Sequence, residues 1–197
     1  EDLGALRTLH QDLAVTAAMR ERFRLLERHL DAARRVVGDA AKVWVLCMAA
    51  MLADLPPRES EKWCHQMRLR REDCEAVRQC LERVPEVMRR LQEGEPPPSR
   101  VASLLEPLGE EAAAYLYVTG GDKVRKKMRS YFAKWKKMGP SISGRDLAEM
   151  GLPPSRLYSQ ILEKIRADVL DGKVKGKEEE LALARTLVEK AKERKAG

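Results

Sequence analysis

Residues 40–53, AAKVWVLCMAAMLA, contain a single charged side chain and are apolar on almost every side of a helix. A helix with no polar face is buried all round, so this segment is expected to form the core helix of the first half of the chain. The whole chain is 35% charged and only 5% aromatic, and this composition favours helices over strands. We therefore predict an all-α fold of about eight to ten helices in two packed subdomains.

Helical periodicity extends on both sides of this segment. Apolar residues recur at spacings of three and four through residues 1–38, where Gly38 is a plausible end of a helix. Pro57 suits the first turn of a further helix, and Pro85 is expected to bend the one after it. The predicted helices of this half cover residues 1–38 (one or two helices), 40–53, 57–69 and 71–92.

A proline-rich stretch at residues 94–99, GEPPPS, is the one obvious connector. It predicts a first helical subdomain over residues 1–93 and a second over residues 100–197. Ser99 is a candidate N-cap, and Gly120 with Gly121 is expected to end a helix. The helices predicted for the second half begin near residues 99, 108, 122, 143, 154 and 177.

The positive charge of the chain is concentrated in one segment. Residues 122–137, DKVRKKMRSYFAKWKK, hold eight basic residues and one acid, a net charge equal to the +7 of the whole chain. We predict a single helix from Asp122 to about Met138. Its apolar residues fall on one stripe, so one side is expected to pack while the other binds anions. This stripe consists of Val124, Met128, Tyr131, Phe132, Trp135 and Met138.

Three interpretations of this basic segment are open. An ordinary charge run is a solvated helix face, but acids usually alternate with the bases, and no acid follows Asp122 here. A membrane surface would need the apolar stripe that the helix uses for packing. Nucleic acid is therefore favoured, bound through its phosphates. The candidate contacts in the segment are Lys123, Arg125, Lys126, Lys127, Arg129, Lys134, Lys136 and Lys137.

Catalytic motifs are missing from the sequence. Nucleotide transfer uses paired carboxylates that hold two metal ions, and no Asp-x-Asp occurs. The nearest pair, Glu59 and Glu61, is predicted to lie in the first turn of a helix, where the two side chains point to different faces. No P-loop, dinucleotide-binding fingerprint or nucleophile elbow is present. We expect no catalytic residue, metal site or cofactor on this chain, and a binding function instead.

Cysteine usage and hydropathy indicate a soluble cytoplasmic protein. The four cysteines do not have zinc-site spacing and are expected to be free thiols in a reducing compartment. No apolar run is long enough to span a membrane, and no signal segment is recognisable. The chain starts at Glu1 rather than at a methionine, so we expect it to be part of a longer protein.

From Pro140 onward the chain contains, in order, ISGRDL (142–147), GL (151–152), Pro154, IL (161–162), LDGKV (170–174) and KEE (177–179). This ordered set resembles the tail of class II tRNA nucleotidyltransferases, which are the CCA-adding enzymes and their A-adding and poly(A)-adding relatives. Ser155 and Ser159 depart from the glycines usual in that family. Residues 40–120 resemble, more loosely, the helical body of bacterial members that carry further N-terminal domains.

The resemblance implies a modular enzyme. An upstream head would hold Mg²⁺ and CTP or ATP, a neck would select the nucleotide through a Glu-Asp-x-x-Arg element, and body and tail would grip the tRNA. Glu72 and Asp73 match the start of that neck element, but Ala76 stands where its arginine belongs.

In the tail, Gly144 and Arg145 are further candidate RNA contacts, because backbone N–H groups of a helix-entry turn can meet phosphate. The alternative is that Asp146 merely caps a local helix.

The function expected from the sequence is that of a tRNA-binding C-terminal region. It would hold the elbow and the acceptor and T arms of tRNA through their phosphates while the upstream catalytic head adds nucleotides to the 3′ end. The alternative is a helical scaffold whose basic helix binds an acidic protein partner.

Overall fold

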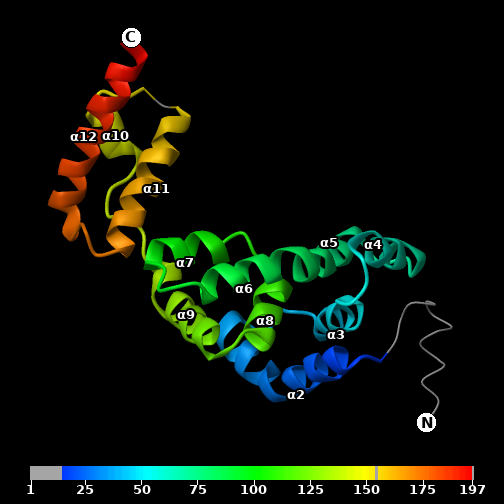
Figure 1. Ribbon diagram of the computed structural model, residues 1–197. Helices are drawn as coiled ribbons and strands as arrows, with labels where there is room; N and C mark the ends of the chain where they lie inside the picture. Colours follow the sequence, from blue (N-terminus) through cyan, green and yellow to red (C-terminus); the bar gives the residue numbers. More distant parts are fainter. Residues whose placement is uncertain (1–14, 154, 197) are drawn as a thin grey trace. The chain divides into compact units, whose positions relative to one another are not determined.

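A computed structural model describes residues 15–153 and 155–196, with side chains described as far as Lys190. Over this part of the chain there are helices and no strands, which confirms the predicted all-α class (Figure 1). The parts of the predicted helices that fall on residues 1–14 and Pro154 lie outside it. The helices are α2 (Ala17–Val37), α3 (Val43–Leu52), α4 (Pro57–Gln66), α5 (Arg71–Arg78), α6 (Val84–Gln92), α7 (Pro98–Leu105), α8 (Glu110–Thr119), α9 (Asp122–Ala133), α10 (Gly144–Glu149), α11 (Arg156–Leu170) and α12 (Gly176–Ala196).

Two compact units divide the chain. The first contains the described residues up to Glu95 together with Leu104–Phe132, and the second contains Pro96–Ser103 together with the residues from Ala133 onward. This division differs from the predicted boundary at residues 94–99, because α8 and α9 pack with the first unit rather than with the second.

Helix α8 is the centre of the first unit. Every residue from Ala112 to Val118 is buried, and α8 packs against α2, α3, α5 and α6. Its alanines let these neighbours approach closely, while its two tyrosines fill the remaining space. The predicted core helix, α3, buries one face but leaves Trp44 42% exposed. The sequence prediction that α3 is buried all round is therefore wrong, and α8 takes that position.

The helix predicted over residues 71–92 is one bent rod of three parts. A π-helical segment, Gln79–Arg83, separates α5 from α6, and the N–H of Val84 donates to the carbonyl of Gln79, five residues back. Pro85 has no N–H and its ring clashes with the carbonyl four residues earlier, so regular helix is disfavoured at this point. The predicted bend near Pro85 is thus taken up by the π segment.

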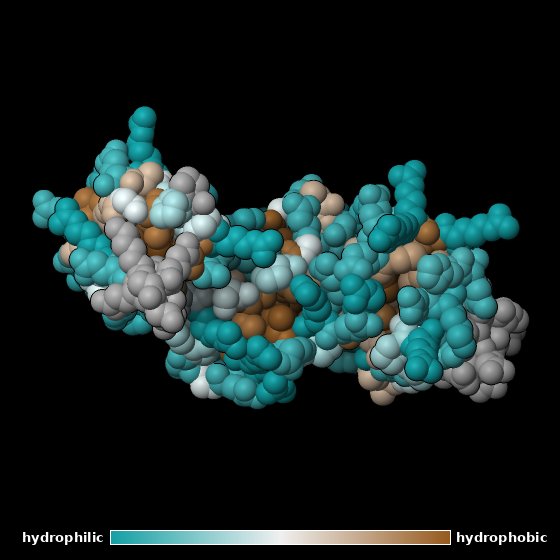
Figure 2. Space-filling view, turned by 90° about the horizontal axis from the view of Figure 1, so that it is seen from above, coloured by the Kyte–Doolittle hydropathy of each residue, from teal (hydrophilic) through white to brown (hydrophobic). Residues whose placement is uncertain are grey.

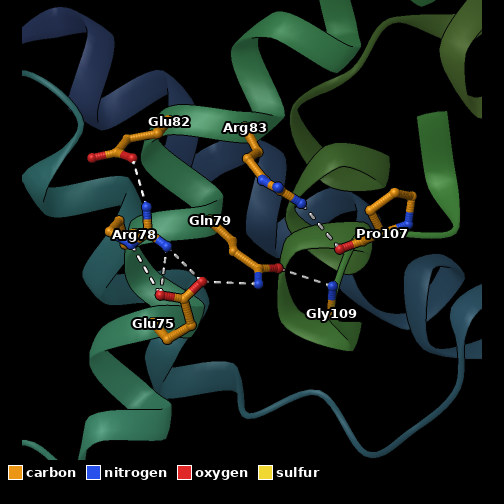
Figure 3. Close-up of polar contacts among 7 residues, drawn as sticks. All are labelled: Glu75, Arg78, Gln79, Glu82, Arg83, Pro107 and Gly109. Atoms are coloured by element: carbon orange, nitrogen blue, oxygen red, sulfur yellow. Dashed lines mark hydrogen bonds and ion pairs between the residues drawn. The ribbon is translucent and has the colours of Figure 1, made fainter.

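Polar side chains of this rod bind the loop that leads into α8 (Figure 3). The Gln79 amide accepts from the N–H of Gly109 at 3.0 Å and donates to Glu75 at 3.2 Å. The guanidinium of Arg83 donates to the carbonyl of Pro107 at 3.4 Å. These bonds fix the start of α8 beside the π segment, within the first unit.

The second unit has its own apolar core, formed between α10, α11 and α12. Glu180 on α12 is 2% exposed, and its carboxylate accepts from the N–H groups of Ser141 and Ile142 at 2.6 and 3.2 Å. Asp171 at the end of α11 accepts from the N–H and the hydroxyl of Ser99 at 2.9 Å each. Ser99 was predicted to cap α7, but the carboxylate of Asp171 performs that function from another helix.

Gly120 is required by the sharp turn between α8 and α9. A Cβ atom there would lie 2.6 Å from the carbonyl oxygen of Leu116 and 2.8 Å from Cγ1 of Val124. Gly121, the next residue, has open space at the same position. The predicted glycine stop is therefore confirmed, and the steric requirement falls on the first glycine of the pair.

The two glycines give a matched test of this turn. Gly120→Ala should lower the free energy of unfolding of the first unit by about 1–3 kcal/mol, because the added methyl group overpacks against backbone. Gly121→Ala should change it by less than about 0.5 kcal/mol, as exposed substitutions do. Urea denaturation of the purified chain measures both, and equal losses would contradict the steric argument.

The link between Ser99 and Asp171 should make the second unit sensitive to acid. Burial raises the pKa of Asp171, but the hydrogen bonds from Ser99 and the charge of Lys173 together hold it below its ordinary value. A lowered pKa in the folded state adds stability above the pKa of the unfolded state, and this stability is lost as the pH falls through the folded value.

The stability difference between wild type and Asp171→Asn should therefore be full above about pH 5 and should shrink as the pH falls below about 4. Thermal unfolding at a series of pH values measures this difference, in which the titration of all other groups cancels. A difference that stays constant with pH would show that the carboxylate charge of Asp171 contributes nothing.

Candidate nucleic-acid interface

The basic segment is shorter as a helix than predicted. α9 ends at Ala133, Lys134 leaves helical geometry, and Trp135–Lys137 form one 3₁₀ turn. Closely spaced lysines without acids disfavour helix continuation, and Gly139 and Pro140 follow directly. The prediction of one helix to Met138 is wrong, and the boundary between the two units falls between Phe132 and Ala133.

One face of α9 is exposed and cationic. Lys123, Lys126 and Arg129 follow one another at intervals of three residues, so they form a row along the side opposite the buried Val124, Met128 and Tyr131. We call these three residues the α9 row. Arg129 lies 3.4 Å from the hydroxyl of Tyr117, while no partner is described for Lys123 or Lys126. The row can therefore meet an anion without breaking ion pairs.

Lys127 is not on this row. It is only 8% exposed, and its ammonium group donates to the carbonyls of Leu91 and Gly94 at 2.7 and 3.2 Å. Leu91 lies in the last turn of α6, where carbonyls lack partners within the helix and a positive charge is favourable. The sequence analysis counted Lys127 among the candidate RNA contacts, whereas in the structure its charge caps α6.

Arg125 is also occupied within the protein. Its guanidinium pairs with Asp122 at 3.1 Å and donates to the carbonyl of Val118, near the end of α8, at 3.3 Å. Its side chain is 11% exposed. Burial and the charges of Arg125 and Arg28 lower the pKa of His29 on α2. Little of Arg125 is accessible to a ligand.

The remaining lysines of the segment belong to the second unit. Lys134, Lys136 and Lys137 are all exposed, on the residue after α9 and on the 3₁₀ turn. The candidate contacts therefore form two sets, one on each unit, instead of the single helix face predicted from the sequence.

At the start of α10, side chains of the turn itself bind the backbone N–H groups. The hydroxyl of Ser143 accepts from the N–H of Arg145 at 3.3 Å, and the carboxylate of Asp146 accepts from the N–H of Ser143 at 2.7 Å. Hydrogen bonds from the N–H and the hydroxyl of Ser143 lower the pKa of Asp146. The expected phosphate contact of the Arg145 N–H is therefore replaced by a capping box, which leaves only the exposed side chain of Arg145 as a candidate.

Gly144 has a packing function. A Cβ atom at this position would lie 3.1 Å from Cδ2 of the Tyr158 ring on α11, so a glycine lets α10 and α11 approach. This contact explains the glycine without any ligand, and the prediction that Gly144 binds RNA has no support in this geometry.

Carboxylates elsewhere are engaged in ion pairs. Asp73 and Glu72, in the first turn of α5, bind the ammonium group of Lys42 at 2.6 and 3.4 Å. Glu59 pairs with Lys62 at 2.7 Å. In the described part of the chain, no three acidic, cysteine or histidine side chains converge as a metal site would need.

The described surface is strongly polar. On the face drawn in Figure 2, charged side chains project and apolar atoms show mainly in the recesses between them. No helix among the described residues is both long and apolar enough to cross a membrane.

The burial of two charged residues was missed by the sequence analysis. The burial of Lys127 could have been predicted, since it lies three residues after Val124 and four before Tyr131, within the apolar stripe. The burial of Glu180 had no comparable signal, because it follows two exposed glutamates in a charged run and its partners lie 38 and 39 residues away.

Comparison with solved structures shows which fold these helices form. The chain aligns with the Thermotoga maritima CCA-adding enzyme complexed with tRNA at a TM-score of 0.75 and 21% identity, over 92% of this chain and 44% of that one. A CCA-adding enzyme in its apo form aligns at a TM-score of 0.72 and 22% identity, over 91% of this chain and 42% of that one. The helices thus have the fold of part of these enzymes.

Comparison of sequences also finds enzymes that add nucleotides to tRNA, although no protein-family profile matches the chain. The A-adding tRNA nucleotidyltransferase of Geobacter sulfurreducens is 25% identical over 203 residues, which cover 96% of this chain and 22% of that protein. The A-adding tRNA nucleotidyltransferase of Halalkalibacterium halodurans is 29% identical over 76 residues, which cover 39% of this chain and 18% of that protein.

The resemblance predicted from the sequence is therefore confirmed, and the chain is similar to the C-terminal helical part of tRNA nucleotidyltransferases. It spans about a fifth of the length of these curated relatives.

Lys126 and Lys127 are neighbours of the same type in opposite surroundings, which makes them a matched pair. Lys127→Met should lower the free energy of unfolding of the first unit by about 2 kcal/mol, because carbonyls at the end of α6 lose a charged donor. Lys126→Met should change it by less than about 0.5 kcal/mol. Urea denaturation measures both, and a neutral Lys127→Met would contradict the capping function.

Proposed function

We propose that this chain is the RNA-holding helical part of a tRNA nucleotidyltransferase, an enzyme that adds nucleotides to the 3′ end of tRNA. The observation that carries the proposal is the similarity to the Geobacter sulfurreducens A-adding enzyme along 96% of the chain. The solved relative from Thermotoga maritima, which has the same arrangement of helices, is complexed with tRNA. Such an enzyme works in the cytoplasm, on its tRNA substrate.

In this proposal the chain holds tRNA by its phosphates. The cations of the α9 row stand on one rigid helix, exposed and with few protein partners, as phosphate contacts require. Phosphate contacts give affinity that does not depend on base sequence, so one surface can serve many tRNAs. The proposed contacts are Lys123, Lys126, Arg129, Lys134, Lys136, Lys137 and Arg145, directed at the elbow and the acceptor and T arms.

The chemistry is assigned to a catalytic head upstream in the parent protein. Metal-assisted nucleotide transfer needs carboxylates for Mg²⁺ and a site for CTP or ATP, and we place both in that head. The contribution of this chain is positional, because holding the body of the tRNA keeps its 3′ end within reach of the head.

The proposal predicts salt-dependent binding that is lost with the α9 row. The triple variant Lys123→Gln, Lys126→Gln, Arg129→Gln should weaken tRNA binding by roughly tenfold or more at moderate salt. It should also reduce the slope of log affinity against log salt by about 2 to 3, since each phosphate contact contributes about 0.9. Filter binding or fluorescence anisotropy over a salt series measures both quantities.

A matched control removes the same charge elsewhere. Lys62, Arg78 and Arg89 are exposed and ion-paired with acids of their own helices. Changing these three to Gln lowers the net charge equally but should leave binding within about twofold if phosphates are met locally. If both triple variants lost tRNA affinity equally, the net charge of the chain rather than the α9 row would account for the loss. Absence of tRNA binding by the wild-type chain at low salt would instead favour a protein-binding scaffold.

A further inference from the structure

Two of the four cysteines flank the turn between α4 and α5. Cys64 lies on α4 and Cys74 on α5, and the backbone of Leu69 in the turn is hydrogen-bonded to both. The N–H of Leu69 donates to the Cys64 carbonyl at 3.2 Å, and the Cys74 thiol donates to the Leu69 carbonyl at 3.8 Å. Cys74 also packs against the apolar cluster that contains Cys64. The two thiols are thus neighbours across one tight turn.

Both cysteines line a pocket of about 390 Å³ in the first unit. Part of its wall is formed by the ion pairs of Arg78 with Glu75 and Glu82, which Figure 3 shows. Arg71, one turn before Cys74, is exposed and also lines the pocket, together with the carboxylate of Glu61. Neither Cys47 nor Cys80 lines this pocket.

We propose that Cys64 and Cys74 form a redox-modification site, which a small disulfide such as oxidised glutathione converts into an intramolecular disulfide. The Cys74 thiol loses its proton to water, and its sulfur attacks one sulfur of the reagent. This breaks the reagent's S–S bond and releases one glutathione thiolate, which takes up a proton. Deprotonated Cys64 then attacks the Cys74 sulfur of the mixed disulfide and releases the second glutathione.

The environments of the thiols set this order of events. Cys74 is half-buried at the pocket wall, whereas Cys64 is only 3% exposed. Burial, with Cys74 and Glu61 nearby, raises the pKa of Cys64 to about 11, so Cys64 is the poorer nucleophile toward a reagent from solution. It reacts second, with the mixed disulfide held beside it on Cys74. Burial raises the pKa of Cys80 still further, and no described contact links Cys80 to the pocket.

The disulfide would lock the corner between two helices. It joins α4 to α5 across a turn in which Arg68 has a left-handed conformation, with φ of 50°. Disulfides in cytosolic proteins are usually transient and redox-sensing, so we expect reversible formation rather than a permanent bond. This inference does not depend on RNA binding, since it concerns different residues of the first unit.

Peptide mapping of the intact, folded chain tests the proposal. The reduced protein is treated with oxidised glutathione, free thiols are alkylated, and trypsin digestion is followed by mass spectrometry without reduction. Trypsin cuts after Lys62, Arg68, Arg71 and Arg78, so the expected product is peptide 63–68 linked to peptide 72–78. Its mass should be two hydrogens below the sum of the two peptides, while Cys47 and Cys80 remain fully alkylated.

Three variants separate the possible outcomes. Cys64→Ser should stop the reaction at a glutathione adduct on Cys74, and Cys74→Ser should leave Cys64 unmodified, whereas Cys80→Ser should still give the linked pair. The proposal is overturned if the wild-type chain shows no linked pair, if it keeps a stable adduct on Cys74, or if the cysteines link indiscriminately. Indiscriminate linkage is the pattern expected of the chain in denaturant, which serves as the control for folding.

Discussion

The complete burial of α8 is the constraint on which the first unit depends. A helix whose residues from Ala112 to Val118 are all enclosed has no face to offer to water, so other helices must surround it. α2, α3, α5 and α6 do so, although they come from the part of the chain before the proline-rich connector. Burial of α8 therefore draws α9 into the first unit as well, because only the short Gly120–Gly121 turn separates them.

Capping of helix ends determines how many cations are available to a ligand. In an all-α protein each helix leaves carbonyls without partners at its C-terminal end. Three basic side chains of the first unit bind such carbonyls: Arg22 that of Ala50 on α3, Lys127 that of Leu91 on α6, and Arg125 that of Val118 on α8. A count of positive charges along the sequence therefore overstates the charge left free at the surface.

The cations that remain exposed are divided between two compact units. The α9 row stands on the first unit, while Lys134, Lys136, Lys137 and Arg145 stand on the second. The α9 row is held by the buried Val124, Met128 and Tyr131, and Arg145 lies on α10, which is held by the cluster around Leu147 and Ile165.

The sequence by itself determined the helical class, most helix ends and the family resemblance, because these depend on local periodicity, on glycine and proline, and on ordered motifs. It also located the segment that carries the net charge. Only the tertiary structure decided that α8 rather than α3 is enclosed, that Lys127 caps a helix, and that Glu180 is buried. The physical reason is that enclosure and hydrogen bonding depend on neighbours far along the chain. Lys127 meets Leu91 and Gly94 across more than 30 residues, and no local pattern encodes such pairings.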